Sequence, residues 1–246
     1  MTLQNKVAVV TGGSRGMGKA MVDALASQGA HVVIASRKVE NCETLKTEIE
    51  QRYGTKALAV RFNASSWTDS DELLERTLAE FGTIDILVNN AGLSPLYSSL
   101  TEVSESLFDK VIGVNLKGPF RLTALAGEHM ATHAGGSIIN IGSIEAVKPS
   151  AQALPYAAAK AGLHVLTEGF AKAYGPSVRV NTIQCGPFLT DISEAWTEEM
   201  RADFESDLAL ERCGQPEEIV GAVLHFASDA SSFTTGAVLR VDGGAL

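Results

Sequence analysis

Three polar side chains in the middle of the sequence have types and spacing suited to proton transfer. Tyr156 and Lys160 stand four residues apart in an alanine-rich stretch, and Ser143 precedes the tyrosine by thirteen residues. Positions four apart share one face of a helix. A neighbouring ammonium group favours the phenolate, so we expect the tyrosine pKa to fall below its usual value of about 10. The pair could then exchange a proton with an alcohol or carbonyl oxygen, to which Ser143 donates a hydrogen bond.

A glycine-rich turn near the start of the chain has the features of a phosphate-binding loop. The sequence TGGSRGMG, residues 11–18, places Gly12, Gly16 and Gly18 between an apolar run and a helical stretch. Such glycines let the backbone approach a pyrophosphate, and the helix that follows directs its N-terminus toward the negative charge. We therefore expect a bound dinucleotide, although glycine-rich turns also serve simply to reverse a chain.

The end of the second apolar run is basic, at a place where an NAD site often carries an acid. Ser36, Arg37 and Lys38 occupy this place. A carboxylate would repel a ribose 2′-phosphate, whereas a serine hydroxyl can donate to it and an arginine fork suits it. Arg15, inside the glycine turn, could approach from the other side. We predict a preference for NADP(H), with NAD(H) as the alternative if Arg37 and Lys38 are only a solvated helix start.

The elements that must position these residues alternate along the chain. Short apolar strands separated by amphipathic helices are typical of a parallel sheet covered on both faces. Strands are expected at residues 6–11, 31–36, 56–63, 84–89, 137–141, 178–183 and 238–241, and helices at 17–28, 39–53, 68–81, 104–130, 156–174 and 216–227. With right-handed crossovers this predicts an α/β fold, a Rossmann-like doubly wound sheet of about seven parallel strands in a single domain, residues 1–246.

The motifs together resemble the short-chain dehydrogenase/reductase family, in its main subfamily of chains of this length. The matching features are T-G-x-x-x-G-x-G at 11–18, NNAG at 89–92, the serine before the tyrosine, Y-x-x-x-K at 156–160 and RVDGG near the C-terminus. The resemblance runs from Lys6 to about Thr190. It implies an oxidoreductase that interconverts a carbonyl (a ketone, an aldehyde or a 3-oxoacyl group) and an alcohol by hydride transfer, without a metal.

The same resemblance assigns roles to individual residues. It makes Tyr156 the acid/base, Lys160 the group that tunes its pKa and contacts the ribose, and Ser143 the partner of the substrate oxygen. It adds Asn115, in VIGVNLKG, which completes a water-linked proton relay through Lys160. The expected cofactor contacts are Gly12, Ser14, Arg15, Gly16, Met17, Gly18, Ser36, Arg37, Lys38, Asn63, Ala64, Asn90, Ala91, Gly92, Ile141, Tyr156, Lys160, Gly186, Phe188 and Thr190.

Two positions depart from the family pattern. Asn63 stands where the family usually has an Asp that receives the adenine amino group, and its amide oxygen can still accept that bond. Cys185 precedes Gly186 where the family usually has a proline, so a fixed φ is lost and an N–H is restored. We interpret Cys185 as a small buried residue rather than as a thiol at the cofactor.

Residues 188–212 fall where the family carries a mobile lid over the substrate. Phe188, Ile192, Trp196, Met200 and Phe204 recur at helical spacing. This apolar face could close over a hydrophobic substrate, or it could pack against the body or a partner subunit.

The walls of the substrate pocket are less well defined. Residues 94–97 and Glu145 are candidates, although both could be loop surface. Around the expected entrance the sequence offers His129, His133 and Lys172 but no arginine cluster. An acyl-carrier protein would need such a basic patch, so a free small molecule is favoured.

Bulk properties exclude several classes of partner. The net charge of −9 makes nucleic acid or an anionic membrane a poor partner. With 45% hydrophobic and 20% charged residues the chain is globular, and no apolar stretch is long enough to span a membrane. The three cysteines form neither a disulfide framework nor a CxxC pair, so the cytoplasm is the expected location. No metal-ligand cluster is evident.

Two other functions remain open from the sequence. One is an NAD-dependent secondary alcohol dehydrogenase. The other is a sensor that binds the dinucleotide without turnover, although such proteins generally lack the Tyr/Lys pair that this chain has. By analogy with the family we also expect a homo-oligomer, a tetramer or a dimer, with helices 104–130 and 156–174 at one interface and the C-terminal helix and strand at another.

Overall fold

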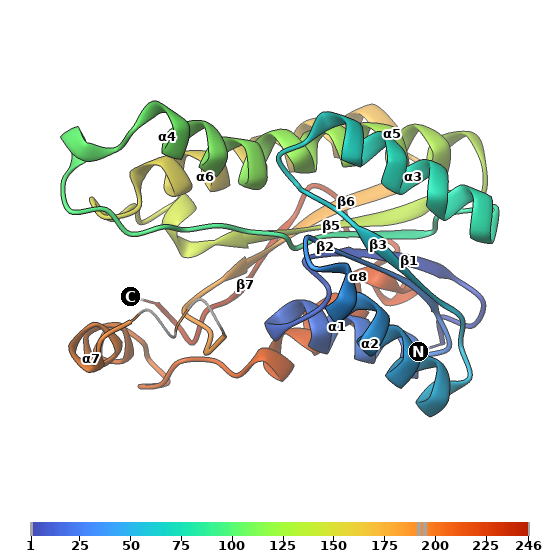
Figure 1. The fold of residues 1–246 in the computed structure, drawn as a ribbon, viewed down its shortest axis with the longest axis horizontal. Coiled ribbons are helices and arrows are strands. Elements are labelled where there is room, and N and C mark those ends of the chain that lie inside the picture. Colours follow the sequence, from blue (N-terminus) through green and yellow to red (C-terminus); the bar gives the residue numbers. More distant parts are fainter. Residues whose placement is uncertain (1, 191–192, 194–195, 246) are drawn as a thin grey trace.

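The computed structural model describes residues 2–190, 193 and 196–245. One parallel sheet runs through them in the order β3-β2-β1-β4-β5-β6-β7 (Figure 1). Its strands are β1 (Val7–Thr11), β2 (His31–Ser36), β3 (Ala57–Arg61), β4 (Ile86–Asn89), β5 (Gly136–Ser143), β6 (Val178–Cys185) and β7 (Val238–Val241). The strand order reverses between β1 and β4, which creates the crevice where open α/β sheets bind ligands. The predicted doubly wound fold is confirmed.

Helices cover both faces of this sheet, as the alternating pattern predicts (Figure 1). One face carries α3 (Trp67–Phe81), α4 (Glu105–Ile112), α5 (Gly118–Thr132) and α6 (Leu154–Tyr174). The other face carries α1 (Gly16–Ser27), α2 (Val39–Tyr53) and α8 (Val220–Ala227), while α7 (Glu198–Ser206) lies near the C-terminus. No helix among the described residues combines the length and the apolar character that a membrane span requires.

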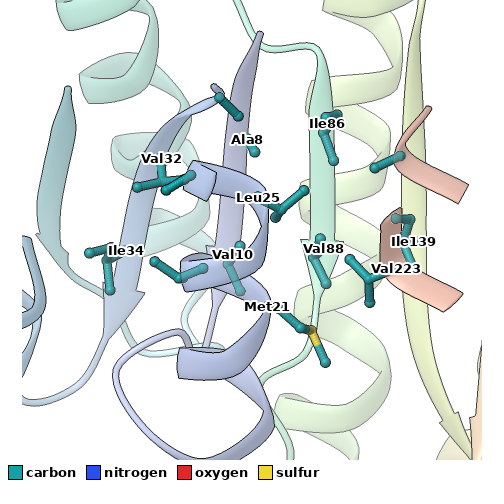
Figure 2. Packing of buried hydrophobic residues seen from close by; sticks show 14 of the residues in the cluster. Ala8, Val10, Met21, Leu25, Val32, Ile34, Ile86, Val88, Ile139 and Val223 are labelled. Atoms are coloured by element: carbon teal, nitrogen blue, oxygen red, sulfur yellow. The ribbon is translucent and has the colours of Figure 1, made fainter. Parts of the chain in front are cut away.

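The strands are apolar on both faces because each face packs against helices. Val10 and Val88 belong to one buried cluster with Met21 and Leu25 of α1, which point at the sheet in Figure 2. Val9, the next residue along β1, belongs to a second cluster on the opposite face. Successive side chains of a strand point to opposite faces of the sheet. When helices cover both faces, the side chains on both sides of the strand are therefore buried and apolar. Each fully buried side chain of this size contributes about 1.5–3 kcal/mol.

The predicted helix over residues 104–130 is instead two helices joined by a π-helical turn, Gly113–Lys117. Pro119 has no N–H, so it cannot bond the carbonyl of Asn115 as a regular α-helix would require. Gly118 lies so close to the carbonyl oxygen of Ala64 that a Cβ there would collide with it. The wider turn buries the side chain of Asn115 completely.

The helical spacing of apolar residues in 188–212 is realised only in part. Among the described residues of this segment the α-helix is α7, and Phe188 forms a bridge with Gly214 in extended conformation. The rings of Trp196 and Phe204 meet edge to face, with 4.9 Å between their centroids. Ile192 lies outside the described residues.

Candidate active site

The glycine turn and the NNAG motif are joined by hydrogen bonds between the ends of β1 and β4. The Thr11 hydroxyl oxygen accepts from the main-chain N–H of Asn90 at 3.0 Å and from that of Ala91 at 3.1 Å. The Asn90 amide donates to the carbonyls of Thr11, at 2.8 Å, and Gly12, at 3.2 Å. The turn is thus fixed by its neighbouring strand. Thr11 belongs to the T-G-x-x-x-G-x-G motif but was not among the predicted site residues, because the sequence does not show which groups its hydroxyl oxygen binds.

The turn itself fits a pyrophosphate. Gly12 and Gly16 have φ values of 63° and 51°, in the left-handed region that favours glycine. A Cβ on Gly18 would collide with the carbonyl oxygen of Gly12. Helix α1 begins here with no side-chain cap and no acidic residue in its first turn. Its first N–H groups are therefore available to an anion, and the helix dipole favours one.

The end of β2 lies against this turn through a pair of hydroxyl groups. Ser14 donates to the Ser36 oxygen at 3.0 Å, so Ser36 retains its own proton for an acceptor. Arg37 and Lys38 are exposed beside it, as is Arg15 on the glycine turn. The sequence between Ile34 and Lys38 contains no carboxylate. This edge of the crevice suits an additional phosphate.

Asn63 follows β3 and uses its amide oxygen locally. That oxygen accepts from the Ser65 N–H at 3.2 Å and from the Ser65 hydroxyl at 2.9 Å, which forms a tight turn. A carbonyl oxygen has two lone pairs. The bond that we expected Asn63 to accept from an adenine amino group would therefore compete with this turn.

Ser143, Tyr156 and Lys160 are brought together, as their spacing predicts. Ser143 is the last residue of β5, and Tyr156 stands in the first turn of α6. The Lys160 side chain is buried, its Nζ donates to the Ile141 carbonyl at 2.7 Å, and it lies 5.5 Å from the centre of the Tyr156 ring. The three groups form one cluster at the carboxyl end of β5.

The electrostatics of this cluster differ from the expectation. Burial raises the pKa of Tyr156 to about 12, although a hydrogen bond with Ser143 opposes the shift. Burial also lowers the pKa of Lys160 to about 8. The lysine faces the tyrosine ring and bonds to a main-chain carbonyl, so desolvation outweighs any stabilisation of the phenolate. Tyr156 is consequently a neutral phenol at pH 7, able to donate a proton.

The buried Asn115 side chain holds the loop that follows NNAG. Its amide donates to the carbonyls of Leu93, at 2.8 Å, and Val111, at 2.9 Å, and its oxygen accepts from the Leu93 N–H at 3.2 Å. The side chain therefore fixes this loop. A relay through Asn115 would use its main-chain carbonyl, for which Pro119 provides no α-helical partner.

The end of β6 and the residues after it lie near Ser143 and near the glycine turn. Cys185 is the register neighbour of Ser143, and burial raises the pKa of its thiol to about 12. It is a neutral buried residue, as we interpreted it. Gly186 passes so close to the Asp242 backbone that a Cβ would come within 2.7 Å of it. Further on, Thr190 lies directly against Gly16 of the glycine turn.

The loop between β5 and α6 is tied down by two side chains. The Glu145 carboxylate accepts from the N–H and the hydroxyl of Ser150, at 2.8 and 2.9 Å. The Tyr97 hydroxyl donates to the Ala151 carbonyl at 2.7 Å and accepts from the Leu154 N–H at 2.9 Å. Tyr97 thereby caps the helix that carries Tyr156. This capping was not predicted, because it joins residues more than fifty positions apart.

Two hollows lie beside this loop. A cavity of about 10 Å³ borders Tyr156 and is lined by Pro95, Tyr97, Leu107, Val111, Ala153 and Pro155. A more open apolar hollow of about 540 Å³ lies between α4 and the start of α6, bordered by Phe108, Leu154 and Ala158. The first adjoins the reacting cluster, whereas the second faces outward.

The structure corrects the expectation that His129, His133 and Lys172 lie at the entrance of the site. His129 and His133 stand at the end of α5, just before β5 begins, and Lys172 lies in the last turn of α6. These positions are at the amino ends of the strands, whereas the cluster lies at the carboxyl ends. The three residues are therefore remote from the site. Within residues 2–190, 193 and 196–245 no group of three or more His, Cys, Asp or Glu is placed to hold a metal ion.

Comparisons with known proteins agree with this geometry. The short chain dehydrogenase family model matches residues 6–201. A 3-oxoacyl-[acyl-carrier-protein] reductase from Thermotoga maritima is 36% identical, with 99% of each chain covered. L-rhamnose 1-dehydrogenase (NAD(P)(+)) from Azotobacter vinelandii is also 36% identical, over 99% of this chain and 98% of that protein. A blue fluorescent protein from a metagenomic library, solved in complex with NADPH, aligns with a TM-score of 0.93 at 33% identity over 99% of both chains. The chain therefore belongs to the short-chain dehydrogenase/reductase family of oxidoreductases, which act on CH–OH and C=O groups.

Proposed function

We propose that this protein is an NADP(H)-dependent reductase that interconverts a ketone or aldehyde and an alcohol. The observation that carries the proposal is that Ser143, Tyr156 and Lys160 form a cluster at the same edge of the sheet as the glycine turn, after which helix α1 begins without a side-chain cap. The whole chain would act as one dinucleotide-binding and catalytic domain, with residues 188–212 as the substrate lid. A bound nicotinamide supplies or accepts the hydride.

The residues of the cluster divide the remaining work. Tyr156, a neutral phenol, donates its proton to the substrate oxygen as the alcohol forms. Ser143 donates a hydrogen bond to the same oxygen and holds it near the phenol. Lys160 favours the phenolate that results, and the main-chain carbonyl of Asn115 anchors the water that returns the proton. At pH 7 Tyr156 is in the protonated form that carbonyl reduction uses.

The cofactor preference rests on the end of β2. Ser36 has a proton to donate, and Arg37 presents a planar fork suited to a phosphate. Lys38 and Arg15 add positive charge on either side. The alternative cofactor, NAD(H), is supported by one relative, because the name of the L-rhamnose 1-dehydrogenase includes both NAD and NADP.

The substrate would be a free small molecule. A 3-oxoacyl group is one candidate, because a 3-oxoacyl-[acyl-carrier-protein] reductase is among the relatives. All three cysteines are buried free thiols, which suits the cytoplasm. We further propose a homo-oligomer that uses α4, α5 and α6 at one interface, where Phe108, Phe120 and Val165 are exposed.

The test is turnover of a panel of carbonyls with NADPH and NADH by wild type and Tyr156→Phe. Tyr174→Phe is the matched control, since it removes a hydroxyl from the far end of the same helix. We expect loss of turnover in Tyr156→Phe alone. Equal rates in all three proteins would contradict the catalytic role, and tight NADPH binding without any turnover would support the sensor.

A further inference from the structure

Glu145 is held in a fixed position next to the proposed reacting group. It follows Ser143 by two residues, and its main-chain N–H donates to the Ser143 hydroxyl oxygen at 3.2 Å. The two bonds from Ser150 hold the other end of the side chain, one to each carboxylate oxygen. Glu145 is therefore held at its main chain by Ser143 and at its carboxylate by Ser150. Its position is fixed relative to the Ser143 hydroxyl, which we propose to hold the substrate oxygen.

The charge of Glu145 is not neutralised by a neighbour. In the described part of the chain no lysine or arginine forms an ion pair with it. The side chain is half-buried, and its charge contributes to the raised pKa of Tyr156. A carboxylate has about four lone-pair sites, of which Ser150 occupies two. Glu145 can therefore accept further hydrogen bonds from a bound molecule.

The segment proposed as the lid adds charge of the same sign. Residues 188–212 contain eight carboxylates and two arginines. Within this segment, α7 has Glu198 and Glu199 in its first turn. Solvent screens the charges of this exposed helix. They therefore add a weak negative potential around the site and form no direct contact with a substrate.

We propose that Glu145 is a specificity-determining residue that selects substrates by charge. It favours carbonyl compounds that carry a cationic amine, or failing that a hydroxyl donor, a few bonds from the carbonyl, and it excludes those with a carboxylate or phosphate there. This inference rests on the proposed reductase function. At an effective dielectric of about 20, reversing a unit charge about 6 Å away changes an equilibrium constant by far more than tenfold, so the effect is measurable after partial screening.

The experiment compares three matched ketones with NADPH. They are 4-(dimethylaminomethyl)cyclohexanone, which is a cation with one N–H at pH 7, 4-hydroxymethylcyclohexanone and 4-oxocyclohexanecarboxylate. Each is assayed with wild type, with Glu145→Gln, which keeps the size and one acceptor oxygen, and with Ser150→Ala, which keeps the charge and the main-chain bond but removes the hydroxyl bond. Glu198→Gln removes a charge from α7 and serves as the control.

In wild type we expect kcat/KM to be at least about thirtyfold higher for the cation than for the carboxylate. Glu145→Gln should reduce this ratio about tenfold, mainly through KM, and leave the hydroxymethyl ketone within about threefold. Ser150→Ala and Glu198→Gln should keep the ratio within about threefold of wild type. A ratio unchanged in Glu145→Gln, with turnover intact, would overturn this inference alone. Absence of turnover of every ketone by wild type would contradict the proposed function and this inference with it.

Discussion

The cofactor side and the substrate side of the crevice are built in different ways. On the cofactor side, a network of hydrogen bonds joins the ends of two neighbouring strands. It uses main-chain groups and the short side chains of Thr11 and Asn90, and it includes the Gly12 carbonyl. On the substrate side, the positions depend on long side chains from loops, such as Tyr97 and Glu145. Strand ends are fixed by the sheet, whereas loop side chains can change without altering the fold. Two relatives with similar identity and coverage are named for different substrates, a 3-oxoacyl-[acyl-carrier-protein] and L-rhamnose, as a variable substrate side would allow.

The largest expected effect separates chemistry from binding on the substrate side. Tyr156→Phe removes the proton donor and should lower kcat for carbonyl reduction by about 10³-fold. Ring packing is retained, so thermal unfolding should change little. Steady-state kinetics with NADPH, alongside the melting temperature, provide the measurement. A fall of less than about tenfold would assign the proton to another group.

A second change should act on the cofactor side alone. Arg37→Asp places a carboxylate where we expect the 2′-phosphate, so kcat/KM for NADPH should fall about 100-fold while that for NADH stays level or rises. The ratio of the two is the readout, and Lys56→Asp, at a distant exposed position, is the charge-matched control. Equal efficiency of wild type with both cofactors would refute the preference before any variant is made.

The pH profile should identify Lys160. Its pKa of about 8 means that the ammonium form predominates below pH 8 and the neutral amine above it. Tyr156, with a pKa of about 12, stays protonated throughout this range. If the reaction requires the ammonium, kcat/KM for reduction should fall about tenfold per pH unit above about 8. Lys160→Met should be slow and flat between pH 6.5 and 9.5, and persistence of the descending limb in that variant would assign it elsewhere.

The smallest effect concerns the support of the substrate side. Tyr97→Phe removes both the bond to Ala151 and the cap on Leu154, so the free energy of unfolding should fall by about 1–2 kcal/mol and kcat by a few fold. Tyr53→Phe is the matched control, because it loses a 2.8 Å bond to Asp23 far from the cluster. Similar stability losses with an effect on kcat in Tyr97→Phe alone would show that the cap positions Tyr156. An equal effect on kcat in both variants would show only general destabilisation.

Prediction from sequence succeeded where local pattern and geometry coincide. The sheet follows from apolar strands alternating with helices, and the approach of Tyr156 to Lys160 follows from one helical turn. The glycine turn could be placed because its residues must have left-handed backbone or close contacts. These features depend on neighbours in the chain or on strand order.

Features that depend on tertiary contacts were missed or wrong. The π-helical turn at Asn115 needed both Pro119 and the approach of Gly118 to Ala64, which lies on another element. The expected lowering of the Tyr156 pKa considered a charge but not desolvation of the phenol. The expectation that His129, His133 and Lys172 lie at the entrance is wrong, because each precedes the amino end of a strand, whereas open α/β sheets bind ligands at the carboxyl ends.

The central claim is that cofactor selection and proton delivery occupy separate regions. The most direct test measures NADPH Kd by fluorescence and the hydride-transfer rate by single turnover at saturating NADPH, in Tyr156→Phe and Arg37→Asp. Tyr156→Phe should retain Kd within about threefold while hydride transfer falls at least about 100-fold. Arg37→Asp should raise Kd at least about tenfold and leave hydride transfer within about threefold. A loss of both quantities in either variant would contradict the separation.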